Sequence, residues 1–68
     1  MLKSNLKQIM QGKGVPIMVL AASAGIAKRT VDRARTDAGI AECRLSTLKR
    51  IADCLGVSVK DLFEDVEK

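Results

Sequence analysis

The side chains best suited to bind a ligand are four cations within eight positions of the sequence: Lys28, Arg29, Arg33 and Arg35. At 100° per residue, Val31, Ala34 and Ala27 fall on one side of a helix over this segment. The opposite side carries charged and polar residues: Lys28, Arg29, Asp32, Arg33 and Thr36. A helix that buries one side and presents cations on the other suits the major groove of DNA, where Arg is a natural bidentate partner of guanine. The segment therefore predicts a DNA-binding helix over about residues 28–35.

A second helix is predicted directly before this one, over residues 17–24. The two meet at Ala24-Gly25-Ile26, where Gly25 permits the positive φ that ends a helix and lets the next one leave at a steep angle. The inward-facing set is expected to be Leu20, Ala21 and Ala24. Some of the remaining aliphatic side chains are left at the surface: Ile17, Met18 and Val19. These three could contact a partner protein, or they could be scattered exposed aliphatics of the kind common on proteins.

The remaining helices are expected to close a core behind this pair. A first helix, ending at Gly12-Lys13-Gly14, carries an apolar stripe at helical spacing: Leu2, Leu6, Ile9 and Met10. Residues 36–44 are rich in turn formers and predict a loop, with Ile40 tucked beneath it. A fourth helix follows Ser46 as its N-cap, ends before Gly56 and buries another stripe: Leu48, Ile51, Ala52 and Leu55.

The last predicted helix is short and runs from Val59 to about Glu64. Ser58 is a good N-cap, and Asp61 stands in the capping-box position three residues later. Residues 65–68 are expected to fray.

Composition and charge favour one small globular domain over residues 1–68, near the lower size limit for a core without staples. Residues 1–36 carry seven cations and one anion, whereas residues 37–68 carry five cations and seven anions. A net +6 half joined to a net −2 half indicates one side that faces a polyanion. Scattered solubilising charge is the alternative.

Several classes of function are not expected. Apolar runs are short and no secretory signal is evident, so a cytoplasmic protein without a membrane span is predicted, associated with the nucleoid when it binds DNA. With no His and only two cysteines, neither a disulfide framework nor a metal site is expected. Cys54 is interpreted as a small residue beside the core and Cys43 as a loop residue. No nucleophile motif or general base suggests an enzyme or a cofactor.

Three runs of this sequence resemble the phage Cro and repressor (XRE-like) family of helix-turn-helix regulators over about residues 5–64: LKQIMQGKGVP, LAASAGIAKRTVDRA and LSTLKRIADCLGVSVKDLF. The motifs that carry the resemblance are L-A-x-x-A-G-I, then T-V, then L-x-x-I-A-x-x-L-G-V-x-x-x-D-L-F. The resemblance implies an all-α, compact five-helix bundle of the lambda-repressor type. It also implies binding to operator DNA as a two-fold dimer, with the recognition helix in the major groove.

The resemblance assigns roles to individual residues. Lys28, Arg29 and Arg33 match base-reading positions, and Asp32 could accept from a cytosine amino group or pair with Arg29 or Lys28. The expected phosphate contacts are Lys13, Thr30, Arg35, Thr36 and Arg44. The sequence departs from the family pattern at five positions. Pro16-Ile17 replaces a polar start of the second helix, and Ala27 replaces a capping Ser or Thr. Met10 and Arg35 stand where many members have an Arg–Glu ion pair, which leaves Arg35 free for phosphate.

The function expected from this sequence is a sequence-specific, Cro/repressor-like transcriptional regulator of phage or prophage type that binds a palindromic operator as a homodimer. The dimer surface is expected near the C-terminus, at Phe63 and Val66. Leu62 is favoured as core, and for Phe63 core and interface are both open. The alternative is a protein-interaction module on the same fold, such as an antitoxin, with its partner at residues 17–19.

Overall fold

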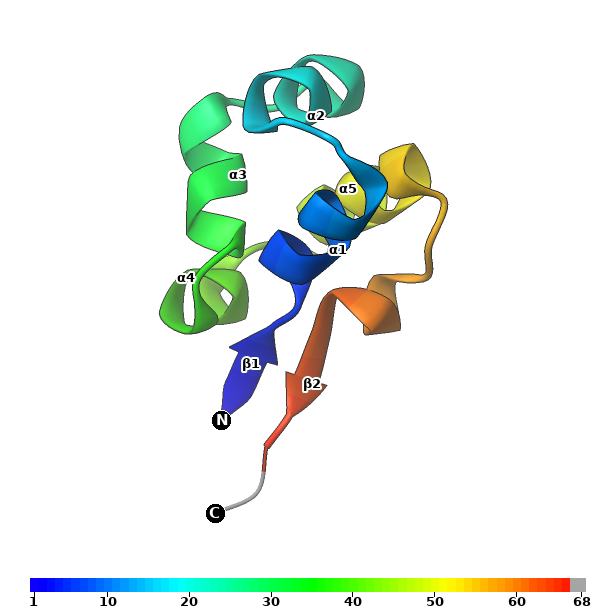
Figure 1. Ribbon diagram of the computed structural model, residues 1–68. Coiled ribbons are helices and arrows are strands. Elements are labelled where there is room, and N and C mark those ends of the chain that lie inside the picture. Colours follow the sequence, from blue (N-terminus) through cyan, green and yellow to red (C-terminus); the bar gives the residue numbers. More distant parts are fainter. Residues whose placement is uncertain (67–68) are drawn as a thin grey trace.

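Five α-helices, one 3-10 helix and two short strands are present in the computed structural model, which describes residues 1–66 (Figure 1). The α-helices are α1 (Leu6–Lys13), α2 (Ile17–Ala24), α3 (Lys28–Ala34), α4 (Asp37–Glu42) and α5 (Leu45–Leu55). The 3-10 helix η1 (Val59–Leu62) leads into β2 (Phe63–Asp65), which pairs antiparallel with β1 (Leu2–Ser4). The predicted helical fold class is confirmed.

Every helix contributes to a single apolar core. The buried cluster consists of Leu6, Met10, Leu20, Ala21, Val31, Ala34, Ile40, Leu48, Ile51, Ala52, Leu55 and Leu62. Fully burying an aliphatic side chain stabilises a fold by about 1.5–3 kcal/mol, so the large enclosed members of this cluster dominate its stability. The inward sets predicted for residues 17–24 and 45–55 are confirmed, as is the burial of Ile40.

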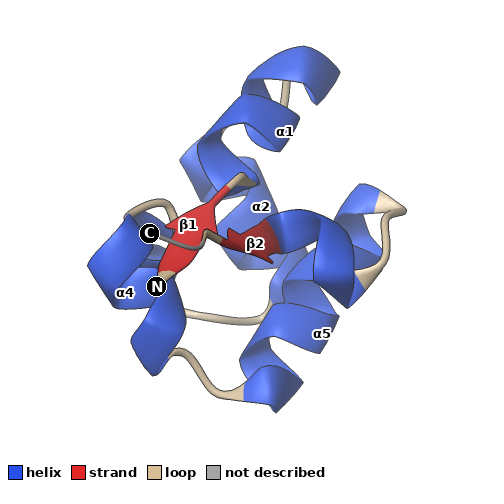
Figure 2. Ribbon diagram, turned by 90° about the horizontal axis from the view of Figure 1, so that it is seen from below, coloured by secondary structure: helices blue, strands red, loops and turns tan. Residues whose placement is uncertain are grey.

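The first predicted helix starts too early, because Leu2–Ser4 forms β1 instead. Leu2 lies opposite Asp65, Lys3 opposite Glu64 and Ser4 opposite Phe63. Ser4 is buried, and its N–H donates to Asp37 Oδ1 at 2.7 Å. These contacts hold Ser4 in the strand, and α1 begins only at Leu6. Figure 2 shows the two strands in red, with α4 beside β1.

The C-terminal helix ends earlier than predicted. It is a 3-10 helix that stops at Leu62, and the residues after it extend as β2. The predicted pairing at its start is present, since the Ser58 N–H donates to Asp61 Oδ2 at 3.0 Å. Asp65 and Val66 were expected to fray but are held, because the Val66 N–H donates to the Met1 carbonyl at 2.8 Å. The rest of the predicted fraying, at residues 67–68, lies outside the described residues.

The predicted loop over residues 36–44 contains helix α4. Thr36 caps this helix, since its Oγ1 accepts from the Gly39 N–H at 2.9 Å and donates to the Arg33 carbonyl at 2.9 Å. A Cβ at Gly39 would overlap that same carbonyl, so the glycine permits a close approach of α4 to the end of α3. The next helix begins two residues earlier than predicted, with Arg44 rather than Ser46 at the N-cap.

Gly39→Ala should lower the free energy of unfolding by about 1–3 kcal/mol, because the added methyl group forces α4 away from the Arg33 carbonyl. Gly12→Ala is the matched control. It also lies within a helix, but a Cβ there meets nothing within 4 Å, so Ala should be neutral or stabilising by up to about 1 kcal/mol. Urea denaturation measures both. Equal effects of the two substitutions would show that the close approach at Gly39 is unimportant.

Candidate nucleic-acid interface

The turn between α2 and α3 has the predicted form. Gly25 has φ 69°, a left-handed backbone conformation that residues with a side chain rarely adopt. The Ile26 N–H donates to the Ala21 carbonyl at 3.0 Å and closes the end of α2. The chain then leaves in a new direction, and α3 lies along one side of the molecule (Figure 1).

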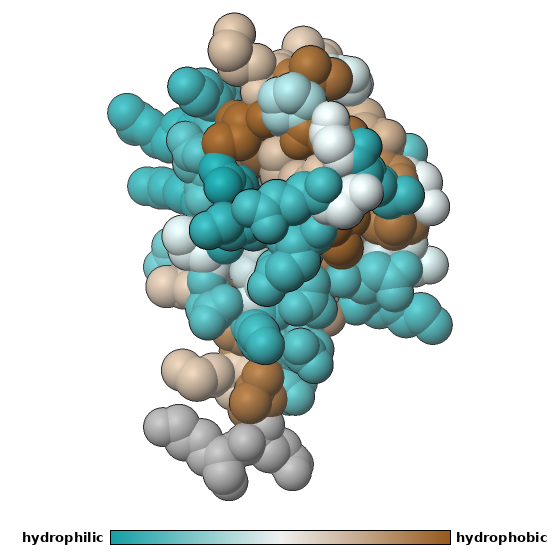
Figure 3. Space-filling view, in the orientation of Figure 1, coloured by the Kyte–Doolittle hydropathy of each residue, from teal (hydrophilic) through white to brown (hydrophobic). Residues whose placement is uncertain are grey.

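Helix α3 has one buried side and one charged side. Val31 and Ala34 are 0% exposed, whereas the four predicted base-reading side chains are all exposed: Lys28, Arg29, Asp32 and Arg33. The prediction that Ala27 completes the buried side is wrong. Ala27 is the exposed N-cap residue with extended backbone, so the helical angle does not apply to it. Hydrophilic side chains project from the side of the molecule where α3 lies (Figure 3).

Asp32 pairs with Arg35 rather than with Arg29 or Lys28. Arg35 Nη1 lies 3.4 Å from Asp32 Oδ1, a geometry that contributes at most about 1 kcal/mol at a partly exposed position. The expectation that Arg35 is free was therefore wrong. Its side chain is only 28% exposed, and within residues 1–66 its buried Nε has no hydrogen-bond partner. It lines a cleft of about 320 Å³ whose other residues include Lys7, Met10 and, in the first turn of α2, Ile17.

Three helices that begin near the cations of α3 lack side-chain N-caps. In the described chain, α2, α3 and α5 begin without a side-chain hydrogen bond and without an acidic residue in the first turn. In contrast, side-chain oxygens accept backbone N–H groups at the starts of α1, α4 and η1: Ser4, Thr36 and Asp61. The first N–H groups of a helix have no partner within it and attract anions. The uncapped starts can therefore donate to phosphate oxygens.

A cleft of about 260 Å³ joins α3 to the end of α4 and the start of α5. Its lining residues are Thr30, Arg33, Gly39, Glu42, Cys43, Arg44 and Thr47. The cleft brings together three predicted DNA contacts, Thr30, Arg33 and Arg44. Thr47 joins them from the first turn of α5. The sequence pattern does not indicate this contact, because it depends on how α5 packs beside α3.

A family model of the Cro/C1-type HTH DNA-binding domain matches residues 5–68. The chain belongs to this family. It is accordingly a DNA-binding regulator with a helix-turn-helix, and the resemblance inferred from the sequence is confirmed. A search of curated proteins and a search of solved structures each found no match. None of the helices within residues 1–66 is both long and apolar enough to span a membrane.

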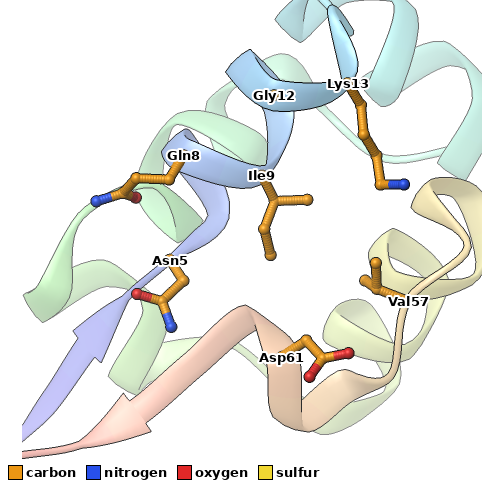
Figure 4. A pocket seen from close by; sticks show the side chains of 7 residues that line it. All are labelled: Asn5, Gln8, Ile9, Gly12, Lys13, Val57 and Asp61. Atoms are coloured by element: carbon orange, nitrogen blue, oxygen red, sulfur yellow. The ribbon is translucent and has the colours of Figure 1, made fainter.

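Two predicted phosphate contacts of this Cro/C1-type domain lie in different surroundings from the others. The Lys13 side chain points into a groove formed by α1, Val57 and η1, rather than toward α3 (Figure 4). The Thr36 hydroxyl already donates and accepts within the protein. Neither residue lines the cleft beside α3.

The residues proposed for protein contacts are partly exposed. Phe63 packs against the core and is only half-buried, Val66 is 39% exposed, and Leu62 is buried, as favoured. On α2, Met18 is 72% and Val19 51% exposed, whereas Ile17 packs against the core.

The surroundings of the two cysteines are the reverse of those predicted, which placed Cys54 beside the core and Cys43 in a loop. Cys54 is exposed, and Cys43 is half-buried beside the core at the end of α4. Burial raises the pKa of the Cys43 thiol; the nearby Arg33 charge opposes this shift and Glu42 adds to it. The Cys43 thiol also donates to the Gly39 carbonyl, with 3.4 Å between Sγ and O.

Iodoacetamide should therefore modify Cys54 several-fold faster than Cys43 at mildly alkaline pH, because the thiolate is the nucleophile and Cys43 is both shielded and harder to ionise. Peptide mass spectrometry over time measures both rates. The Cys43 rate should keep rising as the pH approaches its raised pKa. Equal rates for the two cysteines would contradict the placement of Cys43.

Proposed function

We propose that this protein is a sequence-specific transcriptional regulator that inserts α3 into the major groove of operator DNA. The base-reading side chains are those of its exposed face: Lys28, Arg29, Asp32 and Arg33. The observation that carries this proposal is the division of α3 into a fully buried side and a charged side that points to solvent. A helix held in this way presents its donors to base edges without unfolding any part of the domain.

Phosphate contacts on either side of α3 fix its register on the duplex. Thr30, Arg44 and Thr47 line the cleft at one side of the helix. Arg35, whose side chain is 28% exposed, lies with Ile17 of α2 at a second cleft. The uncapped starts of α2 and α5 add backbone N–H donors at the same two places. Lys13, in the groove beside η1, and Thr36, at the C-terminal end of α3, complete the proposed phosphate set.

The proposed active form is a homodimer on a palindromic operator, with half-sites about one helical turn, roughly 34 Å, apart. Phe63 and Val66 are its proposed contacts. The outer edge of β2 pairs with no other strand among residues 1–66, which leaves backbone groups for a second copy. The acidic residues there already face cations near the N-terminus, since Glu64 lies 4.0 Å from Lys3 and Asp65 lies 3.3 Å from the Met1 amino group. This pairing reduces the repulsion between two β2 strands. In this role the protein would act as a repressor in the cytoplasm.

A second candidate function is an antitoxin-like module that also binds a protein through α2. Exposed Met18 and Val19 favour it. Co-purification with a small protein encoded by the neighbouring reading frame, lost on Met18→Ser, would support it.

Arg33→Ala should weaken binding to the preferred DNA site by about 1–3 kcal/mol and relax preference at one base position, because a bidentate base contact is lost. Arg44→Ala should weaken binding to all sequences alike and lower the salt dependence by about one ion. Lys60→Ala, which removes a cation from η1 on the side away from α3, is the charge control (Figure 1). Fluorescence anisotropy measures each affinity. If Lys60→Ala costs as much as Arg33→Ala, net charge explains the binding and the groove assignment is wrong.

Selection of bound sites from random DNA tests the operator and the dimer together. A palindrome with half-site centres about 10 base pairs apart is expected, because two-fold protein symmetry is mirrored in the site. A single unrepeated half-site would retain the groove assignment and exclude the homodimer.

A further inference from the structure

One buried polar residue, Ser4, lies outside the helix-turn-helix but hydrogen-bonds to the end of its second helix, α3. Ser4, in β1, is 5% exposed and is the single buried polar residue among residues 1–66. Its Oγ donates to the Ala34 carbonyl at 2.6 Å, and its N–H donates to Asp37 Oδ1 at 2.7 Å. One residue therefore joins the N-terminal strand to the last residue of α3 and to the first residue of α4.

The hydrogen bond to Ala34 satisfies a group that the helix leaves unpaired. The last carbonyls of an α-helix have no partner within it, and leaving one buried without a partner is costly. The Ala34 side chain is 0% exposed, so the end of α3 is enclosed by the protein. Ser4, thirty residues earlier in the chain, supplies the donor.

The strand that carries Ser4 is itself held by the other end of the chain. β1 pairs with β2 from Leu2↔Asp65 to Ser4↔Phe63, and the Asn5 N–H donates to the Leu62 carbonyl at 2.8 Å. These contacts fix the backbone on both sides of Ser4. The two chain ends together therefore set the position from which Ser4 reaches α3 (Figures 1 and 2).

We propose that Ser4 is a positioning residue for sequence recognition, which it controls through the C-terminal end of α3. This inference rests on the proposed function of α3. Asp32 and Arg33 are the two residues directly before Ala34, so a displaced helix end moves their side chains first. Lys28 and Arg29 lie in the opposite end of the helix, which the turn at Gly25 holds. Loss of Ser4 should thus weaken discrimination at the bases that Asp32 and Arg33 read, and spare those that Lys28 and Arg29 read.

The test compares Ser4→Ala with Val57→Ala, a half-buried apolar residue across the molecule from α3 (Figures 1 and 4). Affinities for the selected site and for random-sequence DNA are measured where both variants are more than nine-tenths folded. Ser4→Ala should lower the ratio of specific to non-specific affinity about fivefold, a size expected for one buried hydrogen bond, and Val57→Ala should leave it unchanged. An unchanged ratio in Ser4→Ala would overturn the proposal.

Amide hydrogen exchange of the free protein provides a readout that does not depend on DNA. Ser4→Ala should raise exchange in the last turn of α3 and the first turn of α4 relative to α5, and Val57→Ala should not. If the wild-type protein shows no preferred site, the proposed function fails, while this exchange pattern still decides whether Ser4 holds α3. Uniform exchange changes would show that Ser4 contributes only to global stability.

Asp37→Ala covers the case in which Ser4→Ala does not fold. It removes the acceptor of the Ser4 N–H, and residue 37 is exposed, so the core is untouched. The same change in affinity ratio, smaller in size, is expected. A wild-type ratio in this variant would contradict the proposal.

Discussion

The candidate recognition helix has only seven residues, and a helix of this length is not stable by itself in water, where about 12–15 residues are needed even for favourable sequences. It exists because Val31 and Ala34 are fully enclosed by the core and because both of its ends are held. Gly25 and the closing bond from Ile26 hold the start. Thr36 and Ser4 bind the last carbonyls. The strands, which are far from the exposed cations in sequence, and α4, which follows those cations directly, thus contribute to the same helix.

The electrostatic organisation follows from this arrangement. The helices whose first turns line the two clefts beside α3, namely α2 and α5, begin without caps, whereas α4 and η1 have a capping oxygen and an acidic first turn. The partial positive charge at the starts of α2 and α5, near the cations of α3, is therefore not neutralised by the protein, whereas that at the starts of α4 and η1 is. The acidic residues of β2 pair with Lys3 and the Met1 amino group, whereas Glu42 of the negative half lines the cleft beside α3.

Local sequence patterns were enough to predict the helix-turn-helix. The apolar residues of α2 and α5 recur at helical spacing and glycines mark their ends, and Val31 and Ala34 determine which side of α3 is buried. The strands could not be predicted, because three residues are too few to show alternation and their partners lie about sixty positions away. The sequence predicts a loop at the position of α4 because Gly39 resembles a turn former, whereas the role of Gly39 is to permit contact with the Arg33 carbonyl. Partner choices such as Asp32 with Arg35, or Ser4 with Ala34, depend on packing that no local pattern encodes.

The central claim is that α3 and the adjacent helix starts face DNA. Backbone amide NMR shifts recorded while a DNA duplex is added test it most directly. The largest changes are expected in residues 28–35 and in the first turns of α2 and α5, with η1 almost unaffected. Changes centred on η1, with α3 unperturbed, would contradict the account.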